Sequence, residues 1–84
     1  MPGTIHDQQY LELISRLRKA RRISGISQDD LAAKMDRPQS FVSKVETAER
    51  RIDILELLDL CSALEVTLKD VLPPALHKAA GFMR

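Results

Sequence analysis

Apolar side chains recur along this chain at helical spacing, without the alternation of apolar and polar residues that marks a strand. The clearest run comprises Tyr10, Leu13, Ile14, Leu17 and Ala20. Its 3.6-residue period predicts a helix over residues 7–23. Gly25 follows, and a left-handed glycine is a common helix end. The pattern therefore favours an all-α fold.

Three further helix starts share one formula, a capping residue followed three positions later by an acid. The pairs are Ser27 with Asp30, Asp53 with Glu56, and Thr67 with Asp70. Apolar residues on both sides of each start suit a hydrophobic staple. These signals predict helices over residues 27–35, 53–64 and 67–72, the last ended by Pro73-Pro74.

The stretch RPQSFVSKVE, residues 37–46, predicts a fifth helix over residues 38–46, with Pro38 at its first position. Val42 and Val45 lie three residues apart and face the core. The opposite side is polar and carries Gln39, Ser40, Ser43 and Lys44. The turn from the preceding helix is so short that the two must cross steeply, which leaves this polar face exposed.

Length and composition indicate one small helical domain. A chain of 84 residues, 44% hydrophobic and 30% charged, buries only ~60% of its unfolded surface on folding. We expect a single domain over residues 1–84, with its core in 7–72 and a tail in 73–84. No apolar run is long enough to span a bilayer, and the N-terminus lacks a secretory pattern. The lone Cys61 suits a reducing cytoplasm, where we place the protein on the nucleoid.

The charge distribution points to an anionic partner, although the formal net charge is only +1. Residues 16–51 contain ten Lys and Arg against five acids, a net +5, whereas residues 1–15 and 52–84 each carry −2. A basic middle between acidic ends suggests a surface that meets an anion. A solvated mixture of charges is the simpler alternative.

The polar helix has the chemistry of a reader of the DNA major groove. Glutamine can bind the N6/N7 edge of adenine, lysine can reach guanine O6/N7, and serine accepts either partner. Donors for the phosphate backbone surround it: Ser27, Gln28, Arg50 and Arg51.

The segment SQDDLAAKMDRPQSFVSKVETAERR resembles the helix-turn-helix of the lambda-repressor-like, Cro-related (XRE) family of regulators. The resemblance covers about residues 11–72 and implies a five-helix DNA-binding domain with the helix-turn-helix in helices 27–35 and 38–46. By this match Gln28 takes the position of a phosphate-binding glutamine. Gln39, Ser40 and Lys44 fall on the main base-reading positions, with Ser43 beside them.

Arg21 lies on the apolar face of the first helix, where an unpartnered charge is costly. The resemblance pairs it with Glu46, which leaves guanidinium donors for a phosphate. The alternative is that Arg21 extends along the surface to reach solvent.

The sequence departs from the family at three places. Asp36 stands where glycine is usual, and Asp can adopt the left-handed conformation at some cost. Arg37 replaces an apolar residue, and the proline after it forces Arg37 extended, toward the DNA backbone. Thr47-Ala48 replaces a pair that ends in glycine, so a continued helical turn is one conformation open to this loop. The phosphate contacts expected there are Thr47, Arg50 and Arg51. Phe41 could touch DNA or cover the turn.

We expect a sequence-specific transcriptional regulator, of the repressor type, that binds a palindromic operator in double-stranded DNA as a homodimer. By resemblance, the dimer surface is the helix at 67–72 and the tail, with Leu68, Val71, Leu72 and Leu76. The alternatives are an antitoxin with a toxin partner, a restriction-modification controller, and an interaction module that does not bind DNA. No nucleophile or phosphate loop indicates an enzyme. His6, His77 and Cys61 lack metal-ligand spacing, so neither a metal nor a cofactor is expected.

Overall fold

The computed structural model describes residues 7–82, which form helices and no strand. The elements are α1 (Gln8–Ser24), α2 (Gln28–Lys34), α3 (Gln39–Glu46), α4 (Ile54–Leu64), α5 (Leu68–Val71) and a 3-10 helix (Pro74–Leu76). The predicted all-α class with five α-helices is confirmed, and each boundary lies within two residues of the expected one. His6 lies outside the described residues.

Capping side chains set the helix starts as the sequence indicates. Asp7 and Ser27 accept hydrogen bonds from backbone N–H groups in the first turns of α1 and α2. Asp53 and Thr67 form reciprocal capping boxes with the acids three residues later, Glu56 and Asp70. These bonds satisfy N–H groups that have no partner within the helix.

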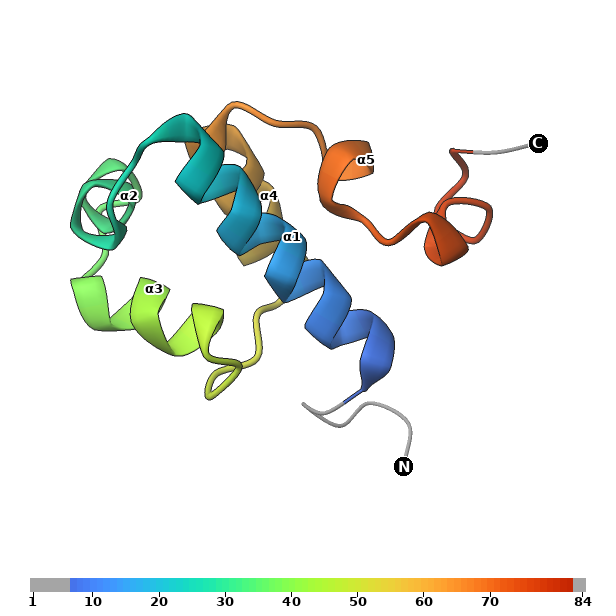
Figure 1. Cartoon of the computed structure of the whole chain (residues 1–84), viewed down its shortest axis with the longest axis horizontal. Helices are drawn as coiled ribbons and strands as arrows, with labels where there is room; N and C mark the ends of the chain where they lie inside the picture. Colours follow the sequence, from blue (N-terminus) through green and yellow to red (C-terminus); the bar gives the residue numbers. More distant parts are fainter. Residues whose placement is uncertain (1–6, 83–84) are drawn as a thin grey trace.

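Helix α1 crosses the middle of the molecule, and α3, α4 and α5 pack against it (Figure 1). Helices α2 and α3 pack closely against each other at one end of the long axis. Helix α5 and the 3-10 helix occupy the other end. The core takes its side chains from all five α-helices: Tyr10, Ile14, Leu17, Leu31, Ala32, Phe41, Val42, Val45, Leu57, Leu60, Cys61, Leu64 and Val71.

The turn between α2 and α3 is held by one left-handed residue and one proline. Asp36 has a φ of 55°, so it does adopt the conformation that glycine provides elsewhere. Pro38 is extended, and its carbonyl accepts a hydrogen bond from the Phe41 N–H. The prediction that Pro38 occupies the first helical position is therefore wrong by one residue, because it caps the helix that Gln39 begins.

The loop after α3 does not continue as a helical turn. The helix ends at Glu46, and Ala48 reverses the chain with a φ of 62°. Tyr10 holds the loop from the other side, since its hydroxyl donates to the Arg50 carbonyl and accepts from the Ile52 N–H. The loop between α3 and α4 is therefore tied to α1.

The expected dimer surface on α5 is largely used inside the chain. Val71 is buried in the core and Leu68 packs against it, while Leu72 and Leu76 are half-buried. Val71 is therefore not available to a second copy, because it packs on the chain's own core. Within residues 7–82, no helix has the length and hydropathy needed to cross a membrane.

Candidate nucleic-acid interface

Helix α3 exposes the polar side chains that the sequence singled out. Gln39, Ser40 and Lys44 are exposed and Ser43 is half-buried. On the opposite side, Val42 and Val45 are buried in the core. The helix is thus anchored by its apolar side and presents a polar face about two turns long.

A chain of hydrogen bonds runs from this face into the core. The Gln39 side-chain nitrogen donates to Gln28 Oε1 over 2.8 Å. The Gln28 side-chain nitrogen donates to Glu46 Oε1 over 2.9 Å. Arg21 holds the Glu46 carboxylate through two hydrogen bonds, one from Nε and one from a terminal nitrogen. Three side chains, one each from α1, α2 and α3, therefore fix the orientation of the Gln39 amide.

Arg21 is a positioning residue in this arrangement. Its remaining terminal nitrogen donates to the Ile26 carbonyl over 2.8 Å, and the hydrogen bonds to Glu46 raise the pKa of Arg21. The guanidinium is largely buried and faces Glu46, as expected for the pair. The geometry does not favour the additional phosphate contact expected of Arg21, because its donors point inward.

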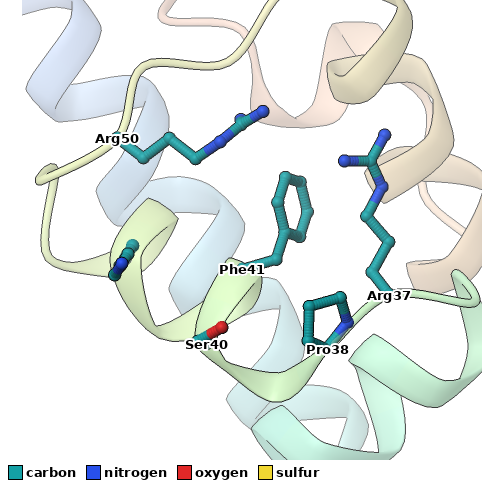
Figure 2. A pocket seen from close by; sticks show the side chains of 6 residues that line it. Arg37, Pro38, Ser40, Phe41 and Arg50 are labelled. Atoms are coloured by element: carbon teal, nitrogen blue, oxygen red, sulfur yellow. The ribbon is translucent and has the colours of Figure 1, made fainter.

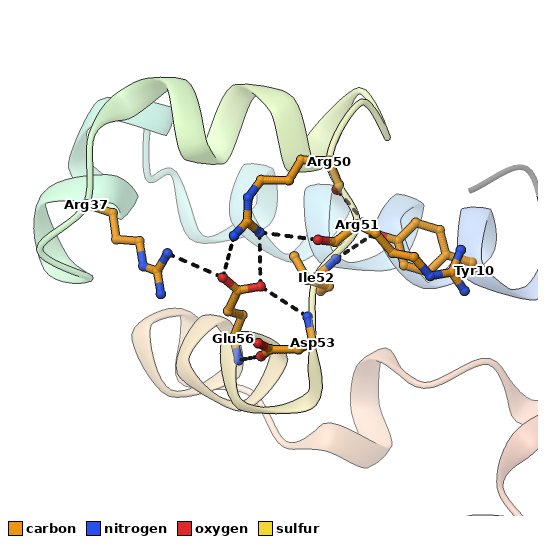
Figure 3. A network of polar contacts seen from close by, with 7 residues as sticks. All are labelled: Tyr10, Arg37, Arg50, Arg51, Ile52, Asp53 and Glu56. Carbon is orange, nitrogen blue, oxygen red and sulfur yellow. Dashed lines mark hydrogen bonds and ion pairs between the residues drawn. The ribbon is translucent and has the colours of Figure 1, made fainter. Parts of the chain in front are cut away.

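A second polar cluster surrounds Glu56, a residue that the sequence analysis identified only as part of a capping box. Arg50 donates to both Glu56 oxygens, over 2.9 and 2.7 Å, and Arg37 donates to Oε2 over 3.3 Å (Figure 3). The Asp53 N–H supplies a fourth hydrogen bond. The hydrogen bonds from Arg50 are the main reason that the pKa of this buried carboxyl falls from 4.5 to about 2.

Arg37 and Arg50 therefore have partners within the chain. Arg37 was expected to point to the DNA backbone, but its guanidinium lies against Glu56. Both arginines keep further N–H groups, since each guanidinium carries five. The cluster therefore holds two guanidinium groups in fixed positions beside α3.

Phe41 lies between these two arginines. Its ring centroid is 4.5 Å from the central guanidinium carbon of Arg37 and 4.9 Å from that of Arg50. Together with Pro38, Ser40 and Lys44, these three residues line a hollow of about 270 Å³ (Figure 2). Phe41 itself is buried, with the two guanidinium groups over its ring. The hollow thus has an aromatic floor and a cationic rim.

The other expected phosphate contacts also have roles within the chain. The Ser27 hydroxyl accepts from the Asp30 N–H and caps α2. The Thr47 hydroxyl lies 2.7 Å from Glu49 Oε2 and near the carbonyls at the end of α3. The Arg51 guanidinium stacks on the Tyr10 ring at 4.4 Å. Gln28 contacts α3 through Gln39, and Arg37 and Arg50, which both bind Glu56, contact α3 through Phe41.

Two contributors were missed in the sequence. Glu56 lies six residues after Arg50, a spacing that carries no signal until the loop folds back on α4. Tyr10 appears in the sequence only as a core position, and its hydroxyl bonds to residues 40 and 42 positions away. Among residues 7–82, no group of three or more His, Cys, Asp and Glu side chains could hold a metal ion.

Comparisons with known proteins agree with this geometry. Residues 17–71 match a family model described as helix-turn-helix. An XRE-family like protein from Pseudomonas syringae pv. tomato is 40% identical, with a TM-score of 0.76 over 95% of this chain and 93% of that one. The restriction-modification controller protein C.AhdI from Aeromonas hydrophila is 30% identical, with a TM-score of 0.68 over 73% of this chain and 92% of its own. No curated protein sequence matches.

Proposed function

The chain belongs to the XRE family of helix-turn-helix DNA-binding regulators, and we propose that it is a sequence-specific transcriptional repressor that reads the major groove with α3. The observation that carries this proposal is the exposed polar face of α3, whose first glutamine is held in place from the core. A solvated surface helix needs no such support for one of its side chains.

The base contacts follow from the chemistry of the four polar residues. After donating to Gln28, the Gln39 amide retains one N–H and its carbonyl, the pair that matches N7 and N6 of adenine. Lys44 reaches a guanine, and the short side chains of Ser40 and Ser43 let the helix approach the base edges. Specificity then depends on a few base pairs in each half-site.

Phosphate contacts lie on both flanks of α3. On one side are Ser27 and Gln28 at the start of α2, where the helix dipole also favours an anion. On the other side is the hollow over Phe41, where Arg37, Arg50 and Lys44 face a phosphate together. We assign Thr47 and Arg51, in the loop after α3, to the same strand contact.

Helix α3 is short and reaches only a few base pairs, so we propose that two copies bind a palindromic operator in the cytoplasm. Recognition helices in such dimers lie ~34 Å apart, one turn of the duplex. The net charge of +1 keeps non-specific affinity low, because that affinity depends on the number of phosphates neutralised. Base contacts then account for most of the preference for the operator over other DNA sequences.

Selection from random-sequence DNA with the purified protein tests the proposal. We expect a palindromic motif, and its enrichment should disappear for a variant with Gln39→Ala and Lys44→Ala. The matched control carries Gln8→Ala and Lys78→Ala, exposed positions on α1 and the tail. If the wild-type protein enriches no motif, the regulator proposal fails and the alternative of a pure interaction module gains.

A second candidate, a restriction-modification controller, is favoured by the 30% identity to C.AhdI. A controller of this kind would use the DNA interface proposed above and would differ only in the genes that it regulates. The selected motif would then occur beside genes of a restriction-modification system. Absence of the motif from such a position excludes this candidate without affecting DNA binding.

A further inference from the structure

Arg18 is the exposed member of a group of polar side chains that meet at Glu46, the last residue of α3. Its Nε lies 3.9 Å from Glu46 Oε1, the oxygen that also accepts a hydrogen bond from the Gln28 side chain over 2.9 Å. The Arg18 side chain is 48% exposed, whereas that of Arg21, the other arginine at this carboxylate, is 11% exposed. The group therefore contains one buried and one accessible guanidinium.

We propose that Arg18 is a further phosphate-binding residue, and that it makes the DNA backbone contact expected from the sequence for Arg21. The inference rests on the proposed function and adds a residue to which that function assigns no role. Residues three apart are neighbours on the surface of a helix, so Arg18 and Arg21 are adjacent on α1. One of them holds Glu46 inside the protein, and the other reaches solvent.

The charges in this group favour an anion beside Arg18. Arg21 donates to both Glu46 oxygens, so these two opposite charges neutralise each other within hydrogen-bonding distance. Arg18 is 3.9 Å from the same carboxylate, longer than the ~2.7–2.9 Å of a hydrogen bond between charged groups. Two guanidinium groups against one carboxylate leave a net positive charge, and its accessible part is Arg18.

The hydrogen-bonding capacity of the group also suits a phosphate. A guanidinium carries five N–H groups in a planar fork that matches two phosphate oxygens. The Gln28 amide has two N–H groups and donates one to Glu46, which leaves one for a phosphate. Arg18 from α1 and Gln28 from α2 meet at the same carboxylate oxygen, so they can approach one DNA strand together.

The direction of Arg18 distinguishes it from Arg16 on the same helix. Arg16 lies two residues earlier, about 200° around the helix axis, and pairs with Glu12 over 3.0 Å. It lines a hollow with Asp70 and Val71 of α5. Because α5 lies at the opposite end of the molecule from α3 (Figure 1), the charge of Arg18 is directed toward the reading helix and that of Arg16 is not.

A phosphate contact by Arg18 should add affinity without sequence preference, since backbone contacts carry no sequence information directly. Gln28 binds both Glu46 and Gln39, so its loss disturbs the amide that we assign to base reading. When Arg18 is removed, Glu46 keeps its bonds to Arg21 and Gln28. Arg18→Ala should therefore lower affinity and leave base discrimination unchanged.

The salt dependence of DNA binding tests the assignment. Fluorescence anisotropy compares the selected operator with a scrambled duplex between ~50 and ~200 mM salt. For each bound copy, Arg18→Ala should lower the affinity for both duplexes about eightfold at ~0.1 M salt and reduce the slope of log affinity against log salt by about 0.9. Arg18→Lys keeps the charge and should retain the slope. The matched control, Arg16→Ala, removes the same charge from the same helix and should also leave the slope unchanged. Circular dichroism and thermal melting verify that every variant is folded.

Neutral methylphosphonates placed at each operator phosphate in turn separate a direct contact from the general charge of the protein. One position in each half-site should weaken binding of the wild type and of Arg16→Ala, and have no effect on binding of Arg18→Ala. A wild-type slope in Arg18→Ala, or sensitivity of that variant at every position to which the wild type is sensitive, overturns the contact while DNA binding stands. A change in base preference like that of Gln28→Ala also overturns it, because Arg18 would then act through Glu46. A wild-type protein that binds neither duplex refutes the proposed function and this contact together.

Discussion

The Gln39 side-chain nitrogen lies 2.8 Å from Gln28 Oε1, and through Gln28 it is linked to the buried Arg21–Glu46 ion pair. The amide that we assign to base reading is thus held by a side chain from the preceding helix. Holding it in advance reduces the rotamer entropy lost on binding. The relationship also makes the reading function of α3 depend on residues that never touch a base.

Gln28→Ala should therefore weaken base discrimination although it leaves Gln39 in place. Loss of Gln39 itself is expected to cost ~1–3 kcal/mol and to relax preference at one or two base pairs. Gln28→Ala should remove part of that discrimination, in addition to any phosphate contact. Fluorescence anisotropy on operators with single base changes measures both effects, with Gln8→Ala as the control. If the losses of the two variants simply add in the double variant, the hydrogen bond contributes nothing to reading.

The Arg21–Glu46 pair should be far more important for stability than a surface pair of the same kind. Its side chains are 11% and 5% exposed, whereas those of Arg16 and Glu12 are 36% and 47% exposed. Removing one member of a buried pair typically costs 3–5 kcal/mol, because the other charge stays buried.

We expect Glu46→Ala to lower the free energy of unfolding by about 3 kcal/mol and Glu12→Ala by less than about 1 kcal/mol. Urea denaturation followed by circular dichroism measures both. Equal losses in the two variants would show that burial of the Arg21–Glu46 pair has no energetic consequence.

Glu56 should make stability depend on pH in the acid range. Its pKa is lowered from 4.5 to about 2 in the folded state, so its contribution is fully present above pH 4.5. That contribution is lost as the pH falls from 4.5 toward 2. Because Arg37 and Arg50 are partly exposed, solvent screening reduces the effect, and we expect about 1–2 kcal/mol.

Urea titrations at pH 7, 4.5, 3 and 2 measure the contribution of Glu56 to the free energy of unfolding. The difference between wild type and Glu56→Gln should shrink across this window, since other carboxyls titrate equally in both proteins. A difference that stays constant from pH 7 to pH 2 would contradict the assignment of the shift to Glu56.

Arg37 tests the proposed phosphate site over Phe41. Arg37→Ala should weaken binding to all sequences alike and reduce the slope of affinity against salt by about one. Lys78→Ala removes the same charge from the tail and should leave that slope unchanged. A loss confined to one operator sequence would instead place Arg37 on a base.

Periodicity and capping residues were sufficient to predict the helices, because these signals are local. Ser27, Asp53 and Thr67 each mark a helix start that the structure contains. The polar side of α3 was also predictable, since Val42 and Val45 alone specify which side is buried.

The contacts around the loop between α3 and α4 were not predictable from the sequence. They join residues that come together only when the chain folds. Nothing in the sequence indicated that Arg37, just before α3, would contact Glu56 on α4. The burial of Val71 likewise depends on how α5 packs on the core, which its own sequence does not reveal. Glutamate usually lies on the protein surface, so its residue type did not indicate that Glu56 would be buried.

Ala48 offers the last test, because it occupies a glycine conformation without being glycine. Its φ of 62° places it in the left-handed region, which costs an L-residue roughly 1–2 kcal/mol. Ala48→Gly should relieve this strain and raise the free energy of unfolding by about 0.5–1 kcal/mol, after the larger entropy loss of glycine is subtracted. Ala33→Gly, at an exposed position within α2, should lower it by about 0.5–1 kcal/mol. Thermal and urea unfolding measure both changes, and destabilisation by Ala48→Gly would show that this turn carries no strain.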